Sequence, residues 1–158
     1  MTDDKSDVSW VAFGYPEGST AELVVSCSSN TSEIDDLKLI SLKFKAEGPG
    51  GMPELINFLP DADVIYGAFK VVGVDDRGNT VSRRPKFVFV KYLPSTVPTM
   101  KRARCGGHVG AIKGVINSHI DIEIESKSEL TEAEIISKLR ACGGAHQPTS
   151  YEFANYSK

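Results

Sequence analysis

The stretch SRRPKFVFVKYLPSTVPTMKRARCGGHVGAIKGVI, residues 82–116, combines a strand pattern, a helix pattern and a concentration of positive charge. It holds eight of the 18 Lys and Arg residues and none of the 21 Asp and Glu residues of a 158-residue chain whose net charge is −3. Clustered charge attracts partners of the opposite sign. The stretch therefore predicts a surface for an acidic partner. A solvated strand and helix without a partner is the alternative interpretation.

The first half of this stretch has the pattern of a central β-strand. In residues 86–93 apolar side chains lie on both sides, with Phe87 and Phe89 on one and Val88, Val90 and Tyr92 on the other. Residues 64–74 have a similar apolar pattern, and a loop around residues 75–79 separates the two segments. Strands with two apolar faces are covered on both sides. We therefore predict an α+β fold in which a mixed sheet lies between layers of helices.

The second half has the pattern of a helix that begins near Ser95, Thr96 and Pro98 and runs to about Asn117. Its predicted core stripe consists of Val109, Ile112, Val115 and Ile116. The opposite side carries Ala103 and four glycines, at positions 106, 107, 110 and 114. Glycine lowers helix stability by about 1 kcal/mol relative to alanine, so an irregular helix is expected. Glycines also allow another backbone to approach closely.

Lys101, Arg102 and Arg104 lie in the early turns of this predicted helix. The helix dipole disfavours positive charge at that end by a few tenths of a kcal/mol per residue, roughly. A helix optimised only for stability would carry acids there. The position of these three cations therefore favours a role in binding a partner.

The rest of the chain predicts one domain, residues 1–146, followed by a flexible tail, residues 147–158. Strands are expected at residues 9–15, 37–44 and 120–124, with a further candidate at 21–26. A short helix is expected at residues 53–59. A final helix is expected to start at a capping box of Thr131 and Glu134 and to stop at Gly143 and Gly144.

Several classes of function lack support in the sequence. Cys105 and His108 form a Cys-x-x-His pair, but no second pair stands at the spacing of a metal site, and no catalytic constellation accompanies them. No enzyme activity and no cofactor are therefore predicted. The isoelectric point of about 5.6 argues against nucleic acid as a partner, and the aromatic residues of the basic tract are expected in the core.

The expected compartment is the cytoplasm. The N-terminus, MTDDKSDVSW, is acidic and polar and so does not resemble a signal peptide. No apolar run approaches the roughly 20 residues of a transmembrane helix. The three cysteines, Cys27, Cys105 and Cys142, are predicted to be free thiols.

Four segments together resemble coactosin-like proteins of the actin-depolymerising-factor homology superfamily. Residues 82–90, SRRPKFVFV, resemble the family's "SKRSKFVFI" strand, and residues 3–15 resemble its first strand and the approach to it. Residues 101–104, KRAR, are similar to its "QRAK" helix start, and residues 139–145, LRACGGA, to its "KKAGGA" ending. The four segments occur in the family's order and cover most of the chain.

The resemblance implies a mixed sheet of five to six strands with helices on both faces. It also implies a non-enzymatic cytoplasmic protein that binds the side of actin filaments and regulates their dynamics at the cytoskeleton. Two alternatives remain open: a cofilin-type regulator that binds actin monomers and severs filaments, or a module for phosphoinositide headgroups. The predicted actin-binding residues are Arg83, Arg84, Lys86, Lys101, Arg102, Arg104, Lys113 and Arg140.

This chain departs from the family pattern in three ways. The family has a helix before its first strand, and that helix is expected to be missing here. The segment 16–36 is longer than the family's first hairpin, and it could cover the sheet face that the helix would leave open. Glycines at 106, 107, 110 and 114 replace bulkier residues on the outer face of the long helix.

Overall fold

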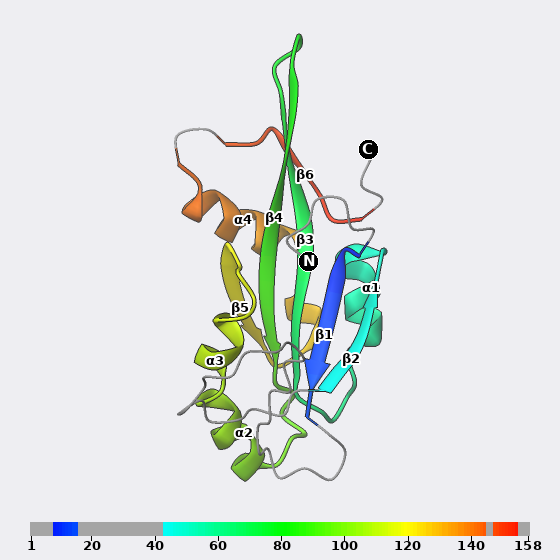
Figure 1. Cartoon of the computed structure of the whole chain (residues 1–158), viewed down its shortest axis with the longest axis vertical. Coiled ribbons are helices and arrows are strands. Elements are labelled where there is room, and N and C mark those ends of the chain that lie inside the picture. Colours follow the sequence, from blue (N-terminus) through cyan, green and yellow to red (C-terminus); the bar gives the residue numbers. More distant parts are fainter. Residues whose placement is uncertain (1–7, 16–42, 145–146, 155–158) are drawn as a thin grey trace, which may run out of the picture.

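The long hairpin of β3 (Ile65–Asp76) and β4 (Val81–Tyr92) forms the centre of the fold. The computed structural model describes residues 8–15, 43–144 and 147–154. Within them, β1 (Trp10–Gly14), β2 (Lys43–Gly48) and β5 (Ile120–Ile124) complete the order β2-β1-β3-β4-β5. A sixth strand, β6 (Ser150–Glu152), pairs with β3. Only β4 and β5 run parallel, so the sheet is mixed, as predicted (Figure 1).

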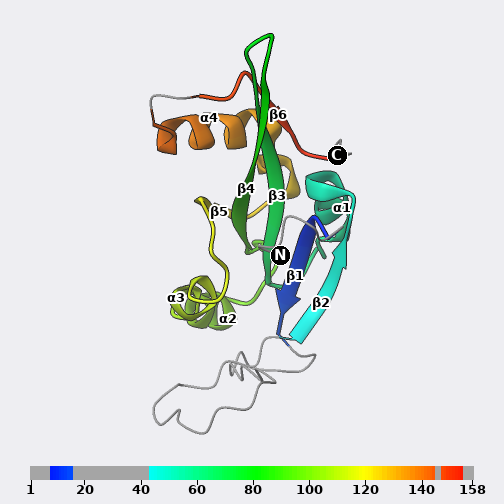
Figure 2. The ribbon, with the colours of Figure 1, turned by 45° about the horizontal axis from the view of Figure 1, so that its top comes forward.

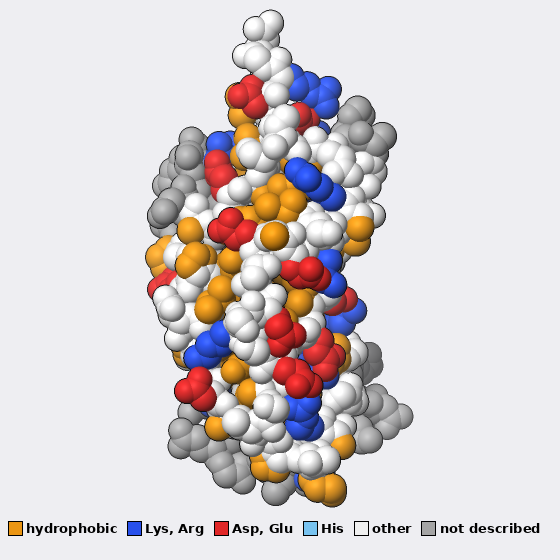
Figure 3. Space-filling model, turned by 180° about the vertical axis from the view of Figure 1, so that it is seen from behind, with side chains coloured by type: hydrophobic (Ala, Val, Ile, Leu, Met, Phe, Trp, Pro, Cys, Tyr) orange, Lys and Arg blue, Asp and Glu red, His pale blue; other side chains and the backbone are white. Residues whose placement is uncertain are grey.

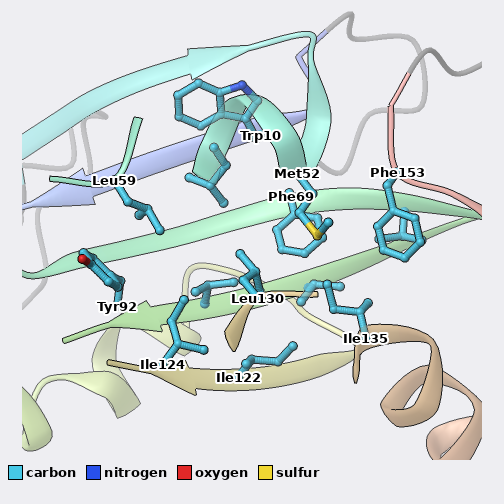
Figure 4. Packing of buried hydrophobic residues seen from close by; sticks show 14 of the residues in the cluster. Trp10, Met52, Leu59, Phe69, Tyr92, Ile122, Ile124, Leu130, Ile135 and Phe153 are labelled. Atoms are coloured by element: carbon cyan, nitrogen blue, oxygen red, sulfur yellow. The ribbon is translucent and has the colours of Figure 1, made fainter. Parts of the chain in front are cut away.

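Helices cover both faces of this sheet. On one face, α1 (Gly51–Phe58) and α4 (Glu132–Cys142) contribute Leu55, Ile135 and Leu139 to the larger apolar cluster. Figure 4 shows the packing of this cluster, in which Phe69 of β3 lies among side chains from several elements. On the other face, α2 (Thr99–Gly106) and α3 (Val109–Lys113) lie over a smaller cluster that contains Cys105 and Ile112. The predicted two-layer cover of the sheet is confirmed.

The alternation predicted for β4 is also confirmed. Val88, Val90 and Tyr92 belong to the larger cluster, whereas Phe89 belongs to the smaller one. Strand β4 begins at Val81, five residues before the predicted start at Lys86, so its first residues run out into the hairpin. The tip projects beyond the rest of the molecule at the top of Figure 1. Gly78 provides the left-handed conformation of the turn, with φ of 79°.

The segment predicted to be a flexible tail contains a strand, and the prediction is corrected for residues 147–154. Ser150–Glu152 pair with Val72–Val74 of β3. Thr149 donates its backbone N–H to the carbonyl of Val74 at 2.8 Å, and Phe153 is buried in the larger cluster. A segment of three residues, Ser150–Glu152, is too short to show an alternating apolar pattern. The strand forms because its backbone groups pair with those of β3. Residues 155–158 lie outside the described part of the chain.

The single helix predicted from about Ser95 to Asn117 is two helices. Helix α2 ends at Gly106 and α3 begins at Val109. Two hydrogen bonds that each span three residues connect them, from the N–H of Gly107 to the carbonyl of Arg104 and from the N–H of His108 to the carbonyl of Cys105, both 3.2 Å. Because α3 ends at Lys113, the helical phase no longer places Val115 in the core. Val115 is 74% exposed, so its assignment to the core stripe was wrong.

Several predictions fall on residues outside the described part of the chain. They concern the missing first helix, the candidate strand at 21–26, most of the strand at 37–44, the cover provided by 16–36, and Cys27. Among the described cysteines, Cys105 is buried and Cys142 is exposed, and both are free thiols. No helix in the described ranges is long and apolar enough to span a membrane.

Candidate functional site

The predicted binding residues divide between the two ends of the molecule. Arg83, Arg84 and Lys86 lie on β4 toward the projecting tip, which we call the hairpin end. Lys101, Arg102 and Arg104 on α2 and Lys113 on α3 lie at the opposite end, the helix end. Figures 1 and 2 show this separation, with α2 and α3 low and the hairpin tip high in both views. The sequence cluster is therefore not one patch.

At the hairpin end, alternation along β4 places Arg84 and Lys86 on the sheet face that α4 covers. Arg84 is exposed and Lys86 is half-buried. Arg140, on α4, is also exposed, and its carbonyl accepts a hydrogen bond from the Gln147 side chain at 2.9 Å. Among the described residues none of these three cations forms an ion pair. Their charge is thus available to an acidic partner.

Arg83 points to the other side of β4 and has a partner within the chain. Its guanidinium forms an ion pair with Glu152 of β6. Because both side chains are about 30% exposed, the pair contributes modestly to stability. The bond nevertheless links the base of the hairpin to β6.

At the helix end, acids on β5 and just after it pair with two of the predicted cations, Arg102 and Lys113. Three ion pairs form a ladder along β5 and its end: Lys113 with Asp121, Lys91 with Glu123 at 2.9 Å, and Arg102 with Glu125 at 2.6 Å. On the face that Figure 3 shows, basic and acidic side chains likewise lie beside one another. Sequence reasoning missed the ladder because it counted the charges of residues 82–116 without their partners on β5. The available signal for these ion pairs was the alternation of acids in residues 120–124, IDIEI, in a chain that also has a basic helix.

Arg102 and Lys101 hold α2 against the sheet. Arg102 donates to the carbonyls of Leu93 at 3.1 Å and Pro94 at 2.9 Å, in addition to Glu125. Lys101 pairs with Asp63 at 2.9 Å, and its ammonium lies 5.7 Å from the centre of the ring of Tyr15, the residue after β1. Arg102 therefore anchors α2 to the end of β4 and to Glu125, and its contact with a partner stays a prediction.

The outer surface of the helix end carries exposed apolar and small residues. Met100 is 70% exposed and Val115 is 74% exposed. A Cβ added at Gly106 or Gly110 would meet open space, so these glycines do face outward as predicted. Arg104 is exposed on the same segment. We call the exposed small and apolar residues of segment 100–115 the glycine surface.

A hollow of about 240 Å³ lies next to the end of α3 on the same sheet face. Its lining is mostly apolar and comes from β1, β3, β4 and the residues after α3: Val11, Phe13, Ala68, Phe87, Val115, Ile116 and Asn117. The described helices thus leave part of this face uncovered. The described residues contain no group of three or more side chains that could hold a metal ion.

Comparison with known proteins gives this arrangement a family. Residues 1–140 match the family of cofilin/tropomyosin-type actin-binding proteins. Coactosin of Entamoeba histolytica is 31% identical over 102 residues, which are 63% of this chain and 66% of that protein. Coactosin of Dictyostelium discoideum is 27% identical over 144 residues, which are 90% of this chain and 82% of that protein.

Solved structures agree with the fold. The crystal structure of the Entamoeba coactosin has a TM-score of 0.64 at 26% identity, covering 89% of this chain and 86% of that one. The solution structure of mouse coactosin, described as an actin filament binding protein, has a TM-score of 0.60 at 22% identity, covering 90% and 82%. The chain therefore belongs to the family of cofilin/tropomyosin-type actin-binding proteins, and within that family it resembles the coactosins.

Proposed function

We propose that this protein binds the side of actin filaments and regulates filament dynamics at the cytoskeleton, in the cytoplasm and without catalysing a reaction. One observation carries the proposal. At the hairpin end, Arg84, Lys86 and Arg140 belong to the same side of the sheet and have no ion-pair partner among the described residues. A filament presents the large acidic surface that such cations would attract.

The two ends make different contributions in this proposal. The hairpin end supplies charge, which steers association and fixes the orientation of the partner. The helix end supplies the glycine surface, on which Met100 and Val115 offer apolar area and Gly106 and Gly110 permit a close approach. Because the ladder already neutralises Arg102 and Lys113, we expect the salt dependence of binding to come from the hairpin end.

Cosedimentation with filamentous actin over a salt series tests the proposal. The double variant Arg84→Gln/Lys86→Gln should bind about two- to thirtyfold more weakly at low salt, because each contact of an exposed charge is worth about 0.2–1 kcal/mol. The matched control is Lys127→Gln, which removes a cation that pairs with Asp61 near the end of β4, away from the hairpin end. Failure of the unmodified protein to bind at low salt would overturn the proposal.

Two further assays separate the alternatives. Accelerated disassembly of pyrene-labelled filaments, with binding to monomers, would identify a cofilin-type severing protein. Flotation with phosphoinositide liposomes, lost in the Arg84→Gln/Lys86→Gln variant, would show that the same cations recognise headgroups. Filament binding without either effect is the outcome that we expect.

A further inference from the structure

A line of hydrogen bonds crosses the smaller apolar cluster between the sheet and the helix end. The Tyr15 hydroxyl lies 2.8 Å from the Tyr66 hydroxyl and 2.8 Å from Nδ1 of His108. The Tyr66 hydroxyl donates to the carbonyl of Cys105 at 3.0 Å. Both tyrosines are fully buried, at 0% exposure, and His108 is half-buried. No residue of this line was predicted to have a role.

The number of hydrogens determines the direction of every bond in the line. A phenol has a single hydrogen, and that of Tyr66 is donated to Cys105. Tyr15 must therefore donate its own hydrogen to Tyr66. No hydrogen of Tyr15 then remains for His108, so Nδ1 of the imidazole must carry a hydrogen and donate it to Tyr15. Burial, the largest cause, raises the pKa of both phenols, which keeps their hydrogens in place.

The line ends on a carbonyl at the break between α2 and α3. In a continuous helix the Cys105 carbonyl would accept from the N–H of Val109. Here it accepts from the N–H of His108 at 3.2 Å and from the Tyr66 hydroxyl, which together use both of its lone pairs. The first and last groups of the line, His108 and Cys105, thus both belong to the break, and the two tyrosines between them belong to the sheet side.

We propose that His108, as the Nδ1-protonated donor of a relay His108→Tyr15→Tyr66→Cys105, is a positioning residue that sets the break between α2 and α3 and thereby the shape of the glycine surface. The relay is one-directional, so each bond polarises and strengthens the next. It couples the break to the sheet, and α3 carries the outward-facing Gly110 and leads to Val115. The link to actin rests on the function proposed above, whereas the relay itself concerns the free protein.

The imidazole tautomer tests the relay without actin. Nitrogen-15 NMR of the full chain at alkaline pH should place Nδ1 of His108 at the shift of a protonated nitrogen. In Tyr15→Phe the acceptor is lost, and the tautomer should move toward the Nε2-protonated form that free histidine side chains prefer. An Nε2-protonated His108 in the unmodified protein would overturn the relay.

Cosedimentation tests the positioning role. His108→Leu, which removes the donor, should weaken filament binding about three- to tenfold, the effect of one lost hydrogen bond. His108→Asn, whose amide can donate from near the position of Nδ1, should bind within about twofold of the unmodified protein. Tyr92→Phe, which removes a hydroxyl from the larger cluster, is the matched control and should bind normally.

The outcomes distinguish the two proposals. Equal binding of His108→Leu, His108→Asn and the unmodified protein would show that the relay has no part in positioning. Weaker binding of His108→Asn and His108→Leu to the same extent would also contradict a donor role. If the unmodified protein itself does not bind, the proposed function has failed, and the tautomer still decides whether the relay exists.

Discussion

Replacing Arg102 by alanine should cost the protein stability, although the sequence pattern assigned this side chain to a partner. Its guanidinium donates to two backbone carbonyls, those of Leu93 and Pro94, and to Glu125, and the side chain is 26% exposed. Each carbonyl bond contributes about 0.5–1.5 kcal/mol net. The pair with Glu125, whose side chain is 58% exposed, adds at most about 1 kcal/mol. We expect Arg102→Ala to lower the free energy of unfolding by about 2–3 kcal/mol.

Urea unfolding followed by circular dichroism measures this loss. An unchanged dependence of the unfolding free energy on urea concentration would show that the variant exposes the same surface on unfolding as the unmodified protein. The control is Lys113→Ala, which removes a single pair with Asp121 between side chains that are about 40% exposed, and should cost less than about 0.5 kcal/mol. If Arg102→Ala cost no more than Lys113→Ala, the reasoning would be refuted. A stable Arg102→Ala variant that no longer bound actin would show that the guanidinium faces the partner.

Three further predictions concern stability. Burial first, and then the charge of Lys86, lowers the pKa of His119 from 6.5 in the folded protein. The unfolded chain therefore binds this proton at higher pH, and stability should fall as the pH drops below about 6.5. In His119→Asn, whose side-chain oxygen can accept the hydrogen bond from Phe87 N–H in place of Nδ1, this part of the pH dependence should vanish in urea titrations. Phe153→Ala should lower the free energy of unfolding by about 3 kcal/mol in urea, because the ring is buried. A negligible loss would instead support the flexible tail predicted from the sequence. Gly73→Ala should lower the melting temperature, because the new Cβ would lie 2.8 Å from Pro148, whereas Gly144→Ala meets open space and should not.

The elements that could be predicted are those whose own residue pattern shows which of their side chains are buried. Strand β4 is an example, because Val88 and Phe89 contact different clusters and the alternation records both. The final helix is another, since Thr131 does accept from the N–H of Glu134 and the helix ends at Gly143. The full capping box, however, forms five residues earlier, between Ser126 and Glu129, at a separate 3-10 helix, Lys127–Glu129.

Features that depend on distant partners could not be predicted. The break after Gly106 involves a hydroxyl from Tyr66, which lies 39 residues away from Cys105. The ladder on β5 depends on which face of a parallel edge strand meets α2 and α3, and residue types alone do not determine that. The charge count located the basic tract in the sequence. It could not show that Arg102 bonds to Glu125 and to backbone carbonyls, whereas Arg84 has no ion-pair partner among the described residues.

The pairing of β6 with β3 has a consequence for the order of folding. Strand β3 pairs with β1 along Ile65–Phe69, and β6 pairs with the next part of the same edge, at Val72–Val74. The segment that closes this edge comes from far downstream, since Thr149 is 75 residues from Val74. Such a contact requires the closure of a long loop and forms late. Until then the upper half of β3 is an open strand edge, which can recruit another chain, so intermediates without β6 should be the species most prone to aggregate.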